Sequence, residues 1–326
     1  MGGGVFLVSG DSSAKSMVKA FPAGLATETV WVIVPKDARS PVSTMPSVPA
    51  GTAPFDEAVT MMEAAHFVNA MEILEELVLA EPTNAAAFRR LGECHYNLME
   101  FEEALTAYER AGELRPNANE GYYIQRGEGF AHLHYGHQLW KQMDRERGSG
   151  QLESAADTFT SAHEHYKKAL EILTLCLNRA PDDVEAVYGR AMAAEGASRK
   201  LWSNAISHLN YGQIERAHVF ADNCIVVINA GLESAQRRAS DPKFQGETGP
   251  YALMGGLYER KATLYQRLGK TDLALIELNN AMGAQRAVLN IDKHNATALE
   301  KLEGCEKYRL EWTSQTAATG GSMGYF

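Results

Sequence analysis

The sequence predicts an all-α fold in which antiparallel helix hairpins stack into a solenoid, with elongated central hairpins and a short N-terminal arm that contains β-strands. Three observations support this prediction. A pattern of small residue, large residue and proline returns at a fixed interval along the chain. A proline follows each of the first three predicted second helices, and a distant segment repeats the same spacing. The solenoid is predicted over residues 53–313.

The repeat is clearest in the first third of the chain. Ala104, Tyr108, Ala111 and Pro116 each have an upstream counterpart at one constant interval, in Ala70, Leu74, Leu77 and Pro82. The small residues let two helices approach closely, the large ones fill the gap between them, and proline ends the second helix because it lacks an amide donor. One such hairpin buries little surface by itself and therefore needs neighbours.

The next proline, Pro181, follows Pro116 after nearly twice the interval that separates Pro82 from Pro116, so the third repeat is longer than the first two. The additional residues are predicted to be helical: 120–146 and 152–180 form two helices that are broken at the glycines of residues 147–150. The insertion therefore lengthens both arms of the hairpin by roughly four turns each.

Two further hairpins follow. Helices are predicted over 184–207 and 212–237, and the polar stretch 240–250 is predicted to be a loop. The fifth repeat restores the aromatic, small and turn positions, and a final polar helix over 296–312 closes the stack. The positions that match in the fifth repeat are Tyr258, Ala262, Tyr265, Gly269, Ala274, Leu278 and Ala281.

These spacings resemble the tetratricopeptide repeat family over about 260 residues. The resemblance implies a superhelix whose concave face commonly holds peptides or helices of other proteins, without chemistry of its own. One subclass clamps the carboxyl terminus of chaperones with Lys and Asn, whereas this chain has Glu93 and Glu259 at such positions. We expect an apolar or mixed partner segment instead, although several of the aromatic residues could equally be core. The partner-binding candidates on the inner positions of first helices are Arg89, Glu93, Tyr96, Asn97, Tyr123 and Tyr188; Met192, Glu195, Glu259, Thr263 and Arg267 share that face.

Residues 1–52 and 314–326 do not fit the repeat. The N-terminal arm has two short β-type runs and a tether rich in Pro, Ser and Thr. Its apolar run around Trp31 has to be covered, and we expect it to pair with a neighbouring chain. The C-terminal tail ends in Tyr325 and Phe326 and is expected to lie on a partner as well.

Composition narrows the function classes. The net charge of −10 argues against nucleic-acid binding, which requires clustered Lys and Arg. No apolar run approaches the roughly 20 residues of a membrane span. The four cysteines are dispersed and are expected to be buried thiols, and the first residues lack a secretion signal, so a cytoplasmic location is predicted.

Five histidines suggest one alternative. His132, His134 and His137 lie on one predicted helix, and His163 and His165 lie on its antiparallel partner. A metal site or an enzyme could use this region, but the odd spacing of the first three favours histidines at a surface or interface. No cofactor and no catalytic residue are predicted.

The predicted function is therefore a non-enzymatic scaffold or assembly subunit that binds other proteins through its groove and its terminal arms. A regulatory module that senses a peptide or a small ligand is the first alternative, and a metal protein or enzyme is the second. Homo- or hetero-oligomers are both compatible with the sequence.

Overall fold

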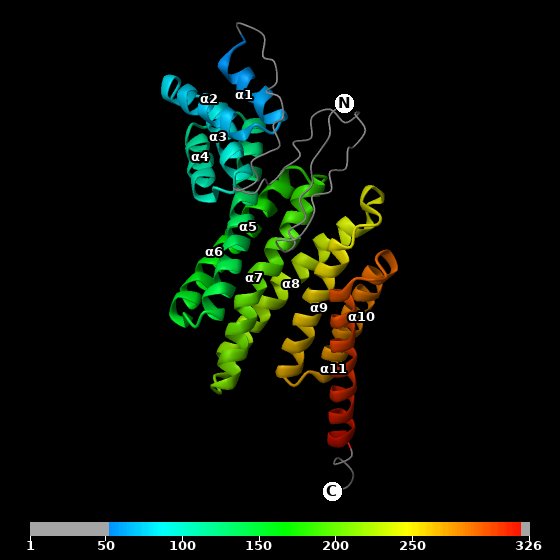
Figure 1. Cartoon of the computed structure of the whole chain (residues 1–326). Helices are drawn as coiled ribbons and strands as arrows, with labels where there is room; N and C mark the ends of the chain where they lie inside the picture. Colours follow the sequence, from blue (N-terminus) through cyan, green and yellow to red (C-terminus); the bar gives the residue numbers. More distant parts are fainter. Residues whose placement is uncertain (1–51, 321–326) are drawn as a thin grey trace. The chain divides into compact units, whose positions relative to one another are not determined.

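The computed structural model describes residues 52–320 of the chain. The predicted N-terminal arm with Trp31, and the tail residues Tyr325 and Phe326, lie outside the described residues. Within residues 52–320 every regular element is helical, which confirms the all-α prediction (Figure 1). The α-helices are α1 (Pro54–Glu63), α2 (Phe67–Ala80), α3 (Ala85–Asn97), α4 (Phe101–Glu113), α5 (Ala118–Gly148), α6 (Leu152–Arg179), α7 (Val184–Asn210), α8 (Ile214–Ser240), α9 (Gly249–Arg267), α10 (Thr271–Ile291) and α11 (Ala296–Gly320), with one 3-10 turn, η1 (Pro242–Phe244).

Contacts divide the chain into two compact units, Met1–His132 and Leu133–Phe326. In unit 1, the hairpins α1–α2 and α3–α4 pack on one another around a core that includes Leu74, Leu91 and Cys94. In unit 2, the hairpins α7–α8 and α9–α10 lie side by side, α6 packs on α7, and α11 packs on α10 (Figure 1). Each unit therefore has helix hairpins and a core of its own.

The predicted elongated hairpin is present. Helix α5 has 31 residues and α6 has 28, whereas α3 and α4 have 13 each. The predicted helices at 184–207 and 212–237 correspond to α7 and α8, which have 27 residues each. The final helix continues to Gly320, beyond the predicted end at residue 312.

Each hairpin turns at a residue with left-handed backbone. These residues are Ala65, Met99, Gly150, Gly212 and Gly269, with φ between 61° and 81°. Glycine adopts this conformation without steric cost, whereas a side chain with a Cβ pays roughly 1 to 2 kcal/mol. Ala65 and Met99 are separated by the same interval as Ala70 and Ala104, so the turn itself follows the repeat.

Two tyrosines fill slots that glycines leave open. Tyr108 of α4 lies where a Cβ on Gly92 of α3 or on Gly127 of α5 would come within 2.9 and 2.6 Å of its ring. Tyr166 of α6 has the same relation to Gly136 of α5 and to Gly196 of α7, at 3.0 and 2.4 Å. The aromatic ring of a second helix is thus accommodated by glycines on the two first helices beside it.

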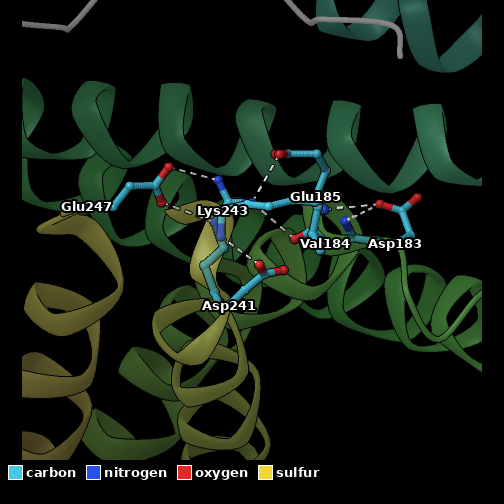
Figure 2. Close-up of polar contacts among 8 residues, drawn as sticks. Asp183, Val184, Glu185, Asp241, Lys243 and Glu247 are labelled. Carbon is cyan, nitrogen blue, oxygen red and sulfur yellow. Dashed lines mark hydrogen bonds and ion pairs between the residues drawn. The ribbon is translucent and has the colours of Figure 1, made fainter. Parts of the chain in front are cut away.

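The side chain of Arg238 connects the loop between α8 and α9 to the start of α7 by hydrogen bonds. Its guanidinium donates to both carboxylate oxygens of Glu247 at 3.1 Å and to Oε1 of Glu185 at 3.0 Å. In Figure 2, Glu247 of the loop and Glu185 of α7 lie on opposite sides of these contacts. The guanidinium also stacks on Phe244, 3.3 Å from the ring centroid. Asp183 caps α7 in the same region, because its carboxylate accepts from the amides of residues 185 and 186.

Candidate partner-binding groove

Unit 2 contains a groove of about 860 Å³ that is lined by five helices. Each helix contributes a stripe at helical spacing, so that one face of each of α5, α6, α7, α9 and α11 borders the same space. The lining residues are Trp140, Met143 and Arg147 on α5; Leu152, Ala155, Ala156 and Phe159 on α6; Glu195, Arg199, Trp202 and Ser203 on α7; Gly256, Glu259, Arg260 and Thr263 on α9; and Lys301 and Tyr308 on α11. We call this space the inner groove.

A carboxylate between two guanidinium groups fixes the centre of the inner groove. Arg199 donates from Nε and Nη2 to the two carboxylate oxygens of Glu195, at 3.1 and 2.8 Å. Arg260 donates to Oε1 of the same glutamate at 2.8 Å and to Oγ of Ser198 at 2.7 Å. Burial opposes ionisation of Glu195, but the charges and hydrogen bonds of Arg260 and Arg199 hold its pKa below the ordinary value. The ion pairs therefore join α7 to α9.

Aromatic side chains continue this arrangement on both sides. The guanidinium of Arg199 lies over the ring of Trp140, 3.9 Å from the centroid, and Trp140 meets Phe159 edge to face at 5.8 Å. On the other side, Nε1 of Trp202 donates to Oγ1 of Thr263 at 3.2 Å. Side chains held by hydrogen bonds and stacking lose little further freedom when a ligand binds, so the lining is preorganised.

The inner groove has an apolar half and a charged half. The hairpin α5–α6 supplies mostly apolar side chains, among them Trp140, Leu152 and Phe159, whereas α7, α9 and α11 supply most of the charges. Four lining residues are cationic and two are acidic, so the lining has a formal charge of +2. The chain as a whole carries −10. The cations are Arg147, Arg199, Arg260 and Lys301, and the acids are Glu195 and Glu259.

The structure corrects the expectation that Arg89, Glu93, Tyr96 and Asn97 line an open groove. All four are buried in unit 1, with exposures of 7%, 3%, 1% and 4%. Arg89 forms ion pairs with Glu93 and, across to α5, with Glu120. Asn97 donates to the carbonyl of Glu93 at 2.7 Å. The first part of α5 covers this face of α3, so these side chains stabilise the packing of two repeats.

The two remaining tyrosine candidates occupy different environments. Tyr123 on α5 is 42% exposed, and its ring lies 5.7 Å from the guanidinium of Arg89. Tyr188 on α7 is half-buried beside Arg238, with its ring centroid 5.2 Å from the guanidinium, and it does not line the inner groove. A partner contact by either residue stays a prediction.

Sequence reasoning placed part of the inner groove correctly and missed the rest. Glu195, Glu259 and Thr263 were expected on the inner face of first helices and line the groove, whereas Met192 and Arg267, expected on the same face, do not. Trp140, Arg199, Trp202 and Arg260 were missed. A signal was present, since Arg199 and Trp202 follow Glu195 by one and two helical turns, and Arg260 and Thr263 stand in the same relation to Gly256.

Two histidines of α5, His134 and His137, are held in the neutral form. Burial lowers the pKa of His134 to about 3, and burial also lowers the pKa of His137 to about 4 although Glu195 opposes this shift. Their rings are 5.7 Å apart, and His137 meets Tyr166 edge to face. His165 packs on Tyr135, and His132 lies 4.0 Å from Glu128. No group of three or more His, Cys, Asp or Glu positioned for a metal ion occurs between residues 52 and 320.

Several of the solved structures to which the chain is similar are described as TPR proteins or domains. MamA from Desulfovibrio magneticus RS-1, residues 41 to the end, is 15% identical, with 72% of this chain and 94% of that chain covered and a TM-score of 0.40. YrrB, described as a TPR protein with an unusual peptide-binding site, is 15% identical over 76% of this chain and 89% of its own, with a TM-score of 0.41. The P58(IPK) TPR domain is 13% identical over 81% and 98%, with a TM-score of 0.14. The curated proteins contain no match to the chain.

The helix hairpins define the class of the protein, a helical-repeat protein. Residues 61–125, which include α2, α3 and α4, match the family model of the tetratricopeptide repeat. This stretch of the chain therefore contains tetratricopeptide repeats, as the spacing of small residues, large residues and prolines predicted. Among residues 52–320, no helix combines the length and the apolar character that a membrane crossing requires.

Proposed function

We propose that the chain is a non-enzymatic protein-interaction module, a scaffold or assembly subunit that holds a segment of a partner protein in the inner groove of unit 2. The observation that supports this function best is the lining of the groove. Four aromatic side chains, Trp140, Phe159, Trp202 and Tyr308, share it with a fixed arrangement of arginines. Aromatic residues and arginine are the residue types that contribute most to binding at protein interfaces.

Gly256 offers a clean way to test the groove. A Cβ on Gly256 would meet only the Nζ of Lys301, at 3.8 Å, so a larger side chain there can point into the groove without disturbing the core. Gly283 on α10 is a matched control, because nothing lies within 4 Å of its Cβ position and it does not line the groove. Both substitutions replace a helical glycine and should preserve the fold.

The experiment is quantitative affinity purification from the native source with the wild type, Gly256→Leu and Gly283→Leu as baits. The proposal predicts partners that remain with wild type and Gly283→Leu and are lost with Gly256→Leu. Circular dichroism should show equal helicity for the three baits. Partners that bind all three equally would place the interface outside the inner groove.

The terminal arms are included in this proposal. Deleting residues 1–50 should leave helicity unchanged and should remove the chain from its complex, if the segment around Trp31 pairs with a neighbouring subunit. Normal assembly of the truncated chain would contradict that role. Removing Tyr325 and Phe326 tests the tail in the same way. The cytoplasmic location stays a prediction, supported by four buried cysteines that form no disulfide.

A ligand-sensing role is a second candidate, because the volume of the inner groove falls within the range of small-molecule sites. A melting temperature that depends on a small ligand would distinguish the sensing role from partner binding. A small molecule that raises the melting temperature of the wild type and of Gly283→Leu, but not of Gly256→Leu, would favour the sensing role.

A further inference from the structure

We infer that the inner groove takes an acidic segment of a partner protein that also carries a large apolar side chain. This inference rests on the proposed function and specifies the chemistry of the segment. Three features support it: the charge of the groove, the position of Lys301 and the apolar surface that the α5–α6 hairpin provides.

The charge of the inner groove is opposite to that of the chain. The lining has a formal charge of +2, whereas the chain has −10. An acidic segment is therefore repelled by much of the protein surface and attracted by the groove. A basic segment would meet the opposite pattern and would be distributed over the surface. Complementary charge of this kind favours one binding position and raises the rate of association.

The cations of the groove differ in how far they are already neutralised. Arg199 and Arg260 both bind Glu195, and Arg147 pairs with Asp144 at 2.9 Å. Lys301 makes no ion pair within 4.0 Å to any residue between 52 and 320, although it is half-buried. Its Nζ lies beside Gly256, where the absence of a side chain leaves room for a ligand carboxylate. Lys301 is therefore the cation from which a bound carboxylate gains most.

The apolar half of the groove suits a large side chain of the partner. Leu152 and Phe159 lie two turns apart on α6, and the small residues Ala155 and Ala156 lie between them on the same face. Leu152 is 68% exposed, and Trp140 closes this surface from α5. The alanines leave space between the large side chains, which suits an inserted aromatic or branched aliphatic side chain.

A protein segment accounts for both halves better than a small anion does. A small carboxylate can neutralise Lys301 but leaves the apolar surface of α6 in water. A segment of several residues reaches both, because the lining extends over five helices and about 860 Å³. Carboxylates bound near Lys301 would fix the direction of the segment, and the apolar side chain would supply most of its buried area.

The test is panning of a phage library of random dodecapeptides against the full chain, followed by titration of synthetic peptides from the enriched pool. The expected peptides are rich in Asp and Glu and contain an aromatic or large aliphatic residue. Their affinity should fall about tenfold or more in Lys301→Glu and in Gly256→Leu, and it should weaken with salt. Lys307→Glu is the matched control, because Lys307 is exposed on the same helix and does not line the groove; Gly283→Leu controls for the glycine replacement.

The outcomes separate this inference from the proposed function. Enriched peptides that are neutral or basic, but that lose affinity for Gly256→Leu, would contradict the preference for an acidic segment and would still identify the groove as a peptide-binding site. Peptides that bind all variants equally, or a pool with no peptide that depends on Gly256, would overturn both. Equal losses in Lys301→Glu and Lys307→Glu would show an effect of total charge and would contradict the role of Lys301.

Discussion

Replacing Gly196 by alanine should destabilise unit 2, although alanine favours helices more than glycine does. The Cβ of the new alanine would lie 2.4 Å from both Cγ and Cδ1 of Tyr166. These are ring atoms close to the backbone, and Tyr166 is only 1% exposed, so the ring has no free space into which it can turn. Overpacking of this kind costs about 1 to 3 kcal/mol.

The gain in helix propensity opposes this cost. Changing glycine to alanine inside a helix contributes up to about 1 kcal/mol, which leaves a net loss of about 0 to 2 kcal/mol for Gly196→Ala. Gly283→Ala on α10 is the matched control, because it brings the same gain and its Cβ meets nothing within 4 Å. The control should therefore be stabilised, and the difference between the two variants should be about 1 to 3 kcal/mol, which is the steric cost alone.

Urea unfolding followed by circular dichroism measures this difference. Both glycines belong to unit 2, so both substitutions are compared in the same compact unit. A second measurement isolates the ring: adding Tyr166→Leu should remove most of the penalty of Gly196→Ala and show positive coupling between the two sites. Equal stability of the two alanine variants would refute the conclusion that Tyr166 fills the slot at Gly196.

Three further substitutions test a turn, a loop anchor and a buried histidine. Ala65→Gly should stabilise unit 1 by about 1 kcal/mol, because φ at this residue is 61°. Ala64→Gly, at a φ of −85°, should destabilise it. The changes in melting temperature of the two variants must therefore have opposite signs. Arg238→Met should cost about 1 to 3 kcal/mol and speed tryptic cleavage of the 241–248 loop, and unchanged cleavage would show that the ion pairs of Arg238 do not hold this loop. The pKa of His137 in the folded protein, about 4, lies below its ordinary 6.5. The contribution of neutral His137 to the free energy of unfolding is therefore complete above pH 7 and is lost as the pH falls from about 6.5 to about 4, by at most about 3 kcal/mol. His137→Gln should flatten this part of the profile of stability against pH.

Much of the helical architecture could be predicted, because local signals mark the ends of the helices. The break expected at residues 147–150 separates α5 from α6, and Gly150 has the left-handed backbone that ends such a helix. The helices expected at 120–146 and 152–180 agree with the structure within two residues at each end. The end of α11 was not predicted, because residues 313–320 are small and polar (Thr, Ser, Gln, Ala and Gly) and carry no stop signal before Gly320.

The lining of the inner groove was less predictable, because helical periodicity identifies the inner face of a helix but not which other helix covers that face. Arg89 and Glu93 lie on the expected inner face of α3, yet both are buried, and Arg89 pairs with Glu120 of the next first helix, α5. The contact between Arg89 and Glu120 joins residues 31 positions apart, and no local pattern reveals it. On α7 and α9, by contrast, Glu195 and Thr263 border the inner groove, where side chains of five helices surround an open space.

The additional length of the helices explains why the groove lies in unit 2. A helix of 13 residues, the length of α3, would end at residue 130 in α5 and at residue 196 in α7. Trp140, Met143 and Arg147, like Arg199 and Trp202, all lie beyond those points. Counted back from its end at Arg179, α6 would likewise begin at residue 167, after Phe159. In the hairpin α3–α4, where both helices have 13 residues, the corresponding packing of Tyr108 against Gly92 is complete. Most of the groove lining on α5, α6 and α7 is thus built from turns that α3, with its 13 residues, does not have.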